Sequence, residues 1–330
     1  MSYYIYQLKF DSPVHFGQAE LGGNLEKIAL DYPSDTLFSA LCCELAQEGE
    51  LNLLEQFYHK AASGNIAFSD LYPYTVDMHG ECCFYVPKPI LGNTERHNSG
   101  DYQYEDACRD SRKKKAMKHL KYVRASQITA YVQSLLGHHE FENNPEFVES
   151  ALIEKVNCRN EEPLPYYVGQ HMFYDNTGLY GIVKADEEDI EWLQNVFTLL
   201  GLSGIGGKRS SGYGKFHLYD DPFEMDEFGV YEDDKELYRR LLDDKATWQM
   251  AISLVLPARD DIAKVTQGWY ALRKRSGFIN EADHVVKRDS LYMVTSGSCF
   301  AGRITGEIAV STGCGHPVYR YGKGLYLGLI

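Results

Sequence analysis

The chain has 330 residues, 44% of them hydrophobic, which is enough for one large or two medium domains with real cores. Its formal net charge of −14 argues against binding of nucleic acid over the whole surface, so such binding must be confined to local basic patches. No apolar run approaches the ~20 residues of a membrane span, and we expect a soluble, cytoplasmic protein whose eight cysteines are reduced.

The N-terminal part of the chain predicts a strand, a helix and two further strands. Residues 3–10 show a period-two pattern that is typical of a half-buried strand. An apolar helical stripe begins at Leu37, and Ser34 or Asp35 can cap the helix that carries it. Further elements are expected as a helix at residues 53–62 and strands at residues 65–74 and 81–86.

Residues from about 92 to 165 are polar and basic, and they predict an inserted segment with weak order of its own. Residues 109–124 hold eight basic side chains against one acid, Asp110. Such a run can line the groove of an RNA backbone, and it can equally be a solvated helix face. The residues alone leave both interpretations open.

A glycine-rich loop at residues 201–216 follows the clearest helical pattern of the chain. That helix is predicted at residues 186–200, with Asp186 as its cap and acids in its first turn. The loop leads into a strand at residues 213–219, and its only charged residues, Lys208, Arg209 and Lys215, are all positive.

This composition favours the binding of an anion. Glycine lets consecutive backbone amides turn towards one point, and such amides form a concavity for phosphate. Arg209 can fork onto a phosphate, while Ser210 and Ser211 can donate hydrogen bonds. A P-loop is excluded because Lys208 is followed by Arg209 rather than by Ser or Thr. A helix-to-strand turn with a basic tip remains the alternative.

The order of elements up to residue 220 is that of a ferredoxin-like unit, with the insertion between the third strand region and the last helix. Residues 221–245 are acidic and are predicted to be a linker. Residues 246–330 predict a second, degraded ferredoxin-like half, including a helix at 260–272. The expected fold is therefore α+β, with two ferredoxin-like halves and a thumb at about residues 92–165 in the first. The aspartate pairs at 233–234, 243–244 and 260–261 are expected to be solvated.

The sequence Gly-Ile-Gly-Gly-Lys-Arg-Ser-Ser-Gly-Tyr-Gly-Lys-Phe at residues 204–216 resembles the glycine-rich loop of the RAMP proteins of CRISPR systems. Within that superfamily the chain is most similar to the fourth subunit of the type III-A (Csm) effector, which caps the 5′ tag of the crRNA. Further similar segments lie at residues 10–17, 34–41, 85–89, 118–123, 275–278, 297–300 and 316–322.

The resemblance implies a non-catalytic subunit that holds the 5′ tag of the crRNA and needs no cofactor or metal. It implies contacts with the Cas10-type large subunit and with the backbone RAMP subunit. The residues expected to bind RNA are Gly204, Gly206, Gly207, Lys208, Arg209, Ser210, Ser211, Gly212, Tyr213, Lys88 and His15. Weaker candidates for contact with RNA or a subunit are Arg273, Lys274, Arg275, Arg320 and Tyr321.

Other roles remain open for several of these residues. Tyr213 can stack on a base or simply pack within its strand. His15 stands where related crRNA-processing RAMP nucleases have a catalytic histidine, so a metal-independent endoribonuclease is one alternative. Asp31 and Asp35 lie in the neighbourhood where backbone RAMP subunits use an aspartate with a metal, although capping explains Asp35. An assembly scaffold without direct RNA contact is the other alternative.

Overall fold

The computed structural model describes residues 1–17, 24–92, 119–135, 141, 145–158, 163–279, 286–311 and 315–330. Most of the basic run, at residues 109–118, lies outside the described residues, and so does much of the predicted thumb.

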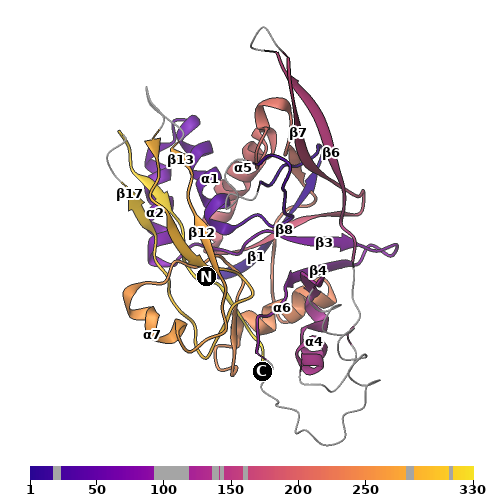
Figure 1. The fold of residues 1–330 in the computed structure, drawn as a ribbon. Coiled ribbons are helices and arrows are strands. Elements are labelled where there is room, and N and C mark those ends of the chain that lie inside the picture. Colours follow the sequence, from indigo (N-terminus) through magenta and orange to yellow (C-terminus); the bar gives the residue numbers. More distant parts are fainter. Residues whose placement is uncertain are drawn as a thin grey trace, which may run out of the picture.

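An antiparallel sheet from the N-terminal part of the chain forms the centre of the molecule (Figure 1). Its strands are β1 (Ser2–Phe10), β2 (Ala67–Phe68), β3 (Tyr72–Val76), β4 (Cys82–Pro87), β5 (Tyr122–Arg124), β8 (Thr177–Ala185), β9 (Phe216–Leu218) and β10 (Phe223–Glu224). The order along the sheet is β10–β1–β8–β3–β4–β5, while β2 pairs with β8 and β9 pairs with β1.

Both faces of this sheet are covered. The helices are α1 (Ser34–Gln47), α2 (Leu51–Ser63), α4 (Ile128–Leu135), α5 (Glu187–Ser203) and α6 (Glu232–Leu242). On one face Tyr4 and Tyr6 of β1 share a core with α1, α2 and α5. On the other face Ile5 shares a core with α4, α6 and strands of the C-terminal half. Strand β1 is therefore buried on both faces, and the prediction of a half-buried strand is wrong because the second cover comes from distant parts of the chain.

The strands β1, β3, β8 and β9 and the helices α1 and α5 have the order of a ferredoxin-like unit. The predicted α+β, ferredoxin-like class is thus confirmed. The strand predicted at residues 81–86 is not the third strand of the unit, because β4 only extends the edge beside β3. The third strand is β8, whose Tyr180 pairs with Tyr72 of β3. The insertion therefore separates the second and third strands.

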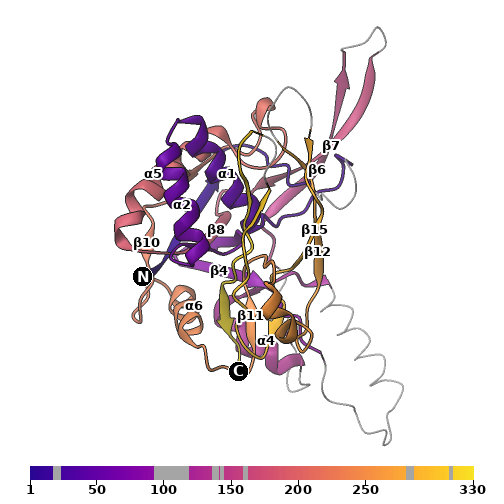
Figure 2. The same cartoon turned by 90° about the vertical axis from the view of Figure 1, so that its left-hand side faces the viewer.

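The last part of the insertion is a regular hairpin rather than a weakly ordered segment. Strands β6 (Val148–Asn157) and β7 (Leu164–Phe173) pair over their full length, from Val148 with Phe173 to Asn157 with Leu164. The hairpin projects away from the rest of the molecule (Figure 2). Its base is tied to the chain after β1, because the His171 amide donates to the Val14 carbonyl at 3.0 Å.

The acidic segment at residues 221–245 is not a linker. It forms β10, which pairs with β1, and α6, which packs beside β4 (Figure 2). Asp233 is fully buried and accepts hydrogen bonds from the Phe84 amide at 2.8 Å and from Arg124 Nε at 2.9 Å. Asp234 is also buried and accepts from the Tyr231 amide at the start of α6. The prediction of a solvated pair was wrong because the basic partner of Asp233 lies far away in the sequence.

The C-terminal half is built from short strands. They are β11 (Gln249–Ala251), β12 (Leu272–Arg275), β13 (Phe278–Ile279), β14 (Val286–Lys287), β15 (Leu291–Val294), β16 (Cys299–Phe300), β17 (Ala309–Ser311), β18 (Val318–Arg320) and β19 (Tyr326–Gly328). The strands β16, β11 and β19 form one sheet, and the others pair as β12–β15, β13–β14 and β17–β18.

The helix predicted at residues 260–272 is much shorter than expected. Helix α7 covers only Ile262–Val265 and follows a 3₁₀ turn at Arg259–Asp261. The chain leaves the helix through a turn, in which the Gly268 amide donates to the Val265 carbonyl at 3.0 Å. A Cβ at Gly268 would lie 2.4 Å from the Phe300 ring. Asp261 is buried and accepts from the Gly306 amide at 2.9 Å, which corrects its prediction as a solvated residue. The division of the chain near residue 245 stays a prediction.

Buried hydrogen bonds connect the two parts of the chain. Asp70 Oδ1 accepts from the Ser34 amide at 2.8 Å and from the Leu254 amide at 2.9 Å. The Tyr72 hydroxyl donates to the Ile252 carbonyl at 2.8 Å. These contacts hold the C-terminal half against the start of α1, which places its arginines beside the glycine-rich loop.

Candidate nucleic-acid interface

The glycine-rich loop connects α5 to β9 and is held by the chain that follows β1. The Ile205 amide donates to the Gly214 carbonyl at 2.9 Å, and the Gly207 amide donates to the His15 carbonyl at 2.8 Å. The Gly214 amide donates to the Pro13 carbonyl at 2.8 Å. These amides are engaged within the protein, so most of the loop does not present them to a ligand as the sequence had suggested.

Glycine is required where the loop crosses itself and the segment after β1. Gly214 has φ 77°, and a Cβ there would lie 1.9 Å from the Ile205 carbonyl oxygen. A Cβ at Gly206 would lie 2.8 Å from the His15 carbonyl oxygen. Gly212 differs, since its φ is 85° but nothing lies within 4 Å of the place that a Cβ would take. The loop thus combines a tightly packed base with an open tip.

The tip consists of Lys208 and the 3₁₀ turn at Arg209–Ser211. Lys208 has φ 62° and is the only non-glycine residue with a positive φ in the described part of the chain. This conformation costs a non-glycine residue about 1–2 kcal/mol. Among the described residues, the amides of Lys208, Arg209 and Ser210 have no hydrogen-bond partner. Of the loop amides that the sequence predicts to bind an anion, those of this tip are therefore the ones left available for a ligand.

The tip faces the β6–β7 hairpin. Lys208 Nζ lies 5.1 Å from the ring centroid of Tyr166, and Lys155 Nζ lies 4.6 Å from that of Tyr213. The Tyr213 hydroxyl donates to Gln170 Oε1 at 2.7 Å. Because Tyr213 is only 7% exposed, packing explains its ring better than stacking on a base. Sequence reasoning missed Lys155 and Tyr166, because neither strand of the hairpin shows the regular alternation of buried and exposed residues that indicates a strand.

His15 lies under the base of the loop rather than at its surface. Its side chain is 4% exposed, and its Nδ1 donates to the Gly169 carbonyl at 2.8 Å. A Cβ at Gly207 would lie 2.7 Å from the His15 ring. These contacts explain His15 as a packing residue that joins the hairpin to the loop.

A pocket of about 410 Å³ lies between the base of the loop, the start of α1 and the C-terminal half. Asp35 pairs with Arg275 Nε at 2.8 Å, and Asp31 pairs with Arg273. Asp35 makes no side-chain cap on α1, so its prediction as a cap is wrong. Ion pairs with guanidinium groups therefore explain both carboxylates without a metal.

Comparisons with known proteins identify the family of this chain. Residues 7–217 match the family model "RAMP superfamily". This chain belongs to the RAMP superfamily. Residues 244–329 also match "CRISPR Csm4 C-terminal domain", a model that covers the C-terminal wall of the pocket.

Two curated RAMP relatives match along the whole chain. "CRISPR system Cms protein Csm4" of Streptococcus thermophilus is 29% identical over 336 residues, which cover 100% of this chain and 99% of the relative. The protein of the same description from Mycobacterium tuberculosis (strain ATCC 25618 / H37Rv) is 28% identical and covers 98% of this chain and 97% of the relative.

Solved structures show the same fold. The Csm4-containing "Csm3-Csm4 subcomplex in the type III-A CRISPR-Cas interference complex" matches with a TM-score of 0.62, 17% identity and 100% of both chains covered. The "Csm1-Csm4 cassette in complex with pppApA" matches with a TM-score of 0.59 at 16% identity and covers 99% of this chain and 98% of that chain.

Lys88 does not join the other candidates of this RAMP chain. It follows β4 near the opposite edge of the sheet from β9, and its amide donates to the Lys121 carbonyl at 2.9 Å. Burial lowers the pKa of its ammonium group. Lys88 does not line the pocket, so any contact with RNA would lie at a separate place.

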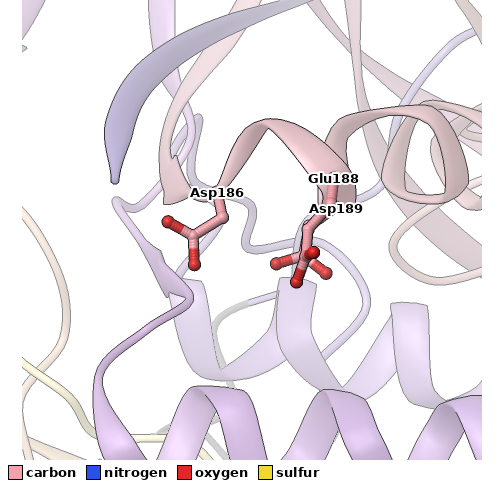
Figure 3. A group of neighbouring side chains, drawn as sticks. All are labelled: Asp186, Glu188 and Asp189. Carbon is pink, nitrogen blue, oxygen red and sulfur yellow. The ribbon is translucent and has the colours of Figure 1, made fainter.

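An acidic cluster at the start of α5 is the one group of possible metal ligands in the described part of the chain (Figure 3). Asp186 pairs with the N-terminal ammonium group at 3.1 Å. Lys60 Nζ lies 2.9 Å from Glu188 and 2.7 Å from Asp189. Since cations of the protein already occupy these carboxylates, the cluster is explained as the ion-paired first turn of a helix. Within the same described residues, no helix is long and apolar enough to cross a membrane.

Acid should destabilise the fold through His171 at the base of the hairpin. Burial lowers the pKa of His171 from 6.5 to about 4, while Ser150 Oγ lies 2.9 Å from its Nδ1. Because this pKa is depressed in the folded state, the stabilisation is complete above pH 6.5 and is lost as the pH falls towards 4. The loss can reach about 3 kcal/mol.

Urea unfolding of the chain and of His171→Gln checks this prediction. From about pH 7 to about pH 4.5 the variant should lose less free energy of unfolding than the unchanged chain. Equal losses in the two proteins would show that His171 does not control this pH dependence.

Proposed function

We propose that this chain is a non-catalytic subunit of a type III-A CRISPR effector and holds the 5′ tag of the crRNA. The observation that carries the proposal is the tip of the glycine-rich loop. There, Lys208 is kept in a strained conformation beside Arg209 and the amides that lack a partner among the described residues. Cations and free amides on an otherwise acidic protein favour a phosphate backbone as the ligand.

The partners follow from the relatives. The similar solved structures pair Csm4 with Csm3 and with Csm1. We infer that this chain likewise contacts a backbone RAMP subunit of the Csm3 kind and a Cas10-type large subunit of the Csm1 kind. This chain would thereby connect the 5′ end of the crRNA, which carries the tag, to both of these subunits.

The absence of catalysis is part of the proposal. His15 is buried and bonded through Nδ1 to the Gly169 carbonyl, and Asp31 and Asp35 are held in ion pairs; these contacts argue against acid–base or metal chemistry by the three residues. The isolated chain should leave repeat RNA intact with or without divalent metal. Clean cuts without metal would favour the endoribonuclease alternative and contradict this part.

Guide retention tests the binding role. Complexes assembled with Lys208→Gly should release a labelled crRNA faster than the unchanged complex, because the glycine removes the cation but suits the backbone. The free energy of unfolding should stay the same or rise by about 1 kcal/mol as the strain is removed. If the variant and the unchanged complex release the crRNA at the same rate, Lys208 does not contact the guide. That result would favour the alternative of an assembly scaffold without direct RNA contact.

A further inference from the structure

A buried carboxylate between α1 and α5 has only one of its two oxygens hydrogen-bonded. Glu44 lies in the last turn of α1, and its side chain is 4% exposed. Its Oε2 accepts a hydrogen bond at 2.9 Å from Ser203 Oγ, at the end of α5. Its Oε1 is buried and has no hydrogen-bond partner in the described part of the chain. Because a buried charged group without a hydrogen bond costs free energy, this oxygen requires an explanation.

The surroundings of Glu44 are unfavourable for a negative charge. The backbone dipoles of α1 and α5 place partial negative charge at their C-terminal ends, and neither helix has a basic residue in its last turn. Asp189 differs, although one of its oxygens is likewise buried without a partner among the described residues. Its other oxygen is held by Lys60 Nζ at 2.7 Å, and it lies in the first turn of α5, where the dipole is positive. The charge of Asp189 is therefore balanced, whereas Glu44 still requires a cation.

Arg209 at the tip of the glycine-rich loop is the cation that pairs with Glu44 in the described part of the chain. Its Nη1 lies 3.9 Å from Glu44 Oε1, so the two groups attract each other without forming a hydrogen bond. The side chain of Arg209 is 35% exposed, so part of its guanidinium group can reach a ligand. A guanidinium group has five donors in a planar fork, and it can bond a carboxylate on one edge and a phosphate on another.

We propose that Glu44 is a positioning residue for Arg209. When a phosphate of RNA approaches the tip, the guanidinium group closes the gap to Oε1, and Glu44 then fixes one edge while the other edge faces the phosphate. The buried oxygen thereby gains a hydrogen bond on RNA binding. Glu44 does not itself line the pocket, so it acts on RNA only through Arg209. The inference rests on the proposed function, in which Arg209 contacts the crRNA, and adds a residue that does not touch RNA.

Positioning and simple repulsion predict opposite effects of the Glu44 charge. A carboxylate near an anion site repels the anion, so removing its charge would strengthen RNA binding if repulsion were its only effect. If Glu44 orients the guanidinium group, removing its charge weakens RNA binding, because Arg209 is no longer held where its bonds to phosphate form. The sign of the change in affinity therefore distinguishes the two roles.

Binding of labelled crRNA to complexes assembled with Glu44→Gln tests the inference. Glutamine keeps an acceptor for Ser203 Oγ and removes the charge, and the affinity should fall by about three- to tenfold. Glu48→Gln is the matched control, because Glu48 is exposed, follows the same end of α1 and undergoes the same change of charge. The control should leave the affinity unchanged or raise it slightly. The inference is overturned if Glu44→Gln raises the affinity or behaves like the control.

A double-mutant cycle with Arg209→Ala separates positioning from a merely structural role. If Glu44 acts through Arg209, Glu44→Gln should weaken crRNA binding no further once Arg209 is alanine. An equal loss in both backgrounds would show that Glu44 only supports the fold, and would overturn the inference.

The cycle also separates this inference from the proposed function. If Arg209→Ala alone leaves the affinity unchanged, Arg209 is not an RNA contact and both fail at this residue. If Arg209→Ala weakens binding while Glu44→Gln does not, the inference fails alone and the RNA contact of the loop tip remains.

Discussion

Replacing both Lys208 and Arg209 by alanine should release the crRNA from the assembled complex. Each charge-assisted hydrogen bond to phosphate contributes about 1.5–3 kcal/mol, so the loss of two should lower the affinity by a factor on the order of 100 to 10,000. The slope of log affinity against log salt should fall by about 1.4, because each phosphate contact on a single strand contributes about 0.7. Binding of labelled guide at several salt concentrations measures both quantities.

A control with the same change in net charge is available on α6. Lys235 and Arg239 are both exposed, and they lie on the opposite side of the sheet from α1 and α5. Replacing both by alanine should leave affinity and salt slope nearly unchanged. If the two double variants weaken binding equally, the effect is one of overall charge and the loop tip is not the contact.

Gly214→Ala should have the largest effect on the loop itself. The new Cβ would overlap the Ile205 carbonyl oxygen, at a φ that alanine avoids. We expect the free energy of unfolding to fall by about 3 kcal/mol or more, with loss of guide binding, since the base of the loop cannot close. Urea unfolding and guide retention measure the two effects.

Gly212→Ala is the matched control for that variant. Gly212 has a similar positive φ, but nothing lies within 4 Å of the position of its Cβ. Only the backbone strain of about 1–2 kcal/mol should appear. Equal losses at Gly212 and Gly214 would contradict the close crossing at the base of the loop.

Several features could be predicted from sequence because local patterns determine them. The helix at residues 186–200 has acids in its first turn and a glycine near its end, and α5 is found there. The basic, glycine-rich loop follows from composition alone. The superfamily follows from the residues of this loop together with short segments along the chain, and the family comparison confirms it.

Other features depend on contacts between distant residues. Asp233 looks solvated in its local acidic context, yet Arg124 and the Phe84 amide bury it. The amides of Gly207 and Gly214 look available, yet carbonyls of the segment after β1 accept them. Likewise, Asp35 looks like a helix cap, but it pairs with Arg275 of the C-terminal half. Local pattern shows which groups are present but not which partners the fold supplies.

Ultraviolet crosslinking of the assembled complex, mapped to peptides and nucleotides, tests the central claim most directly. We predict that the peptide with residues 208–213 crosslinks to nucleotides of the 5′ tag. Crosslinks of the whole tag to other subunits, with none to the glycine-rich loop of this chain, would contradict the account.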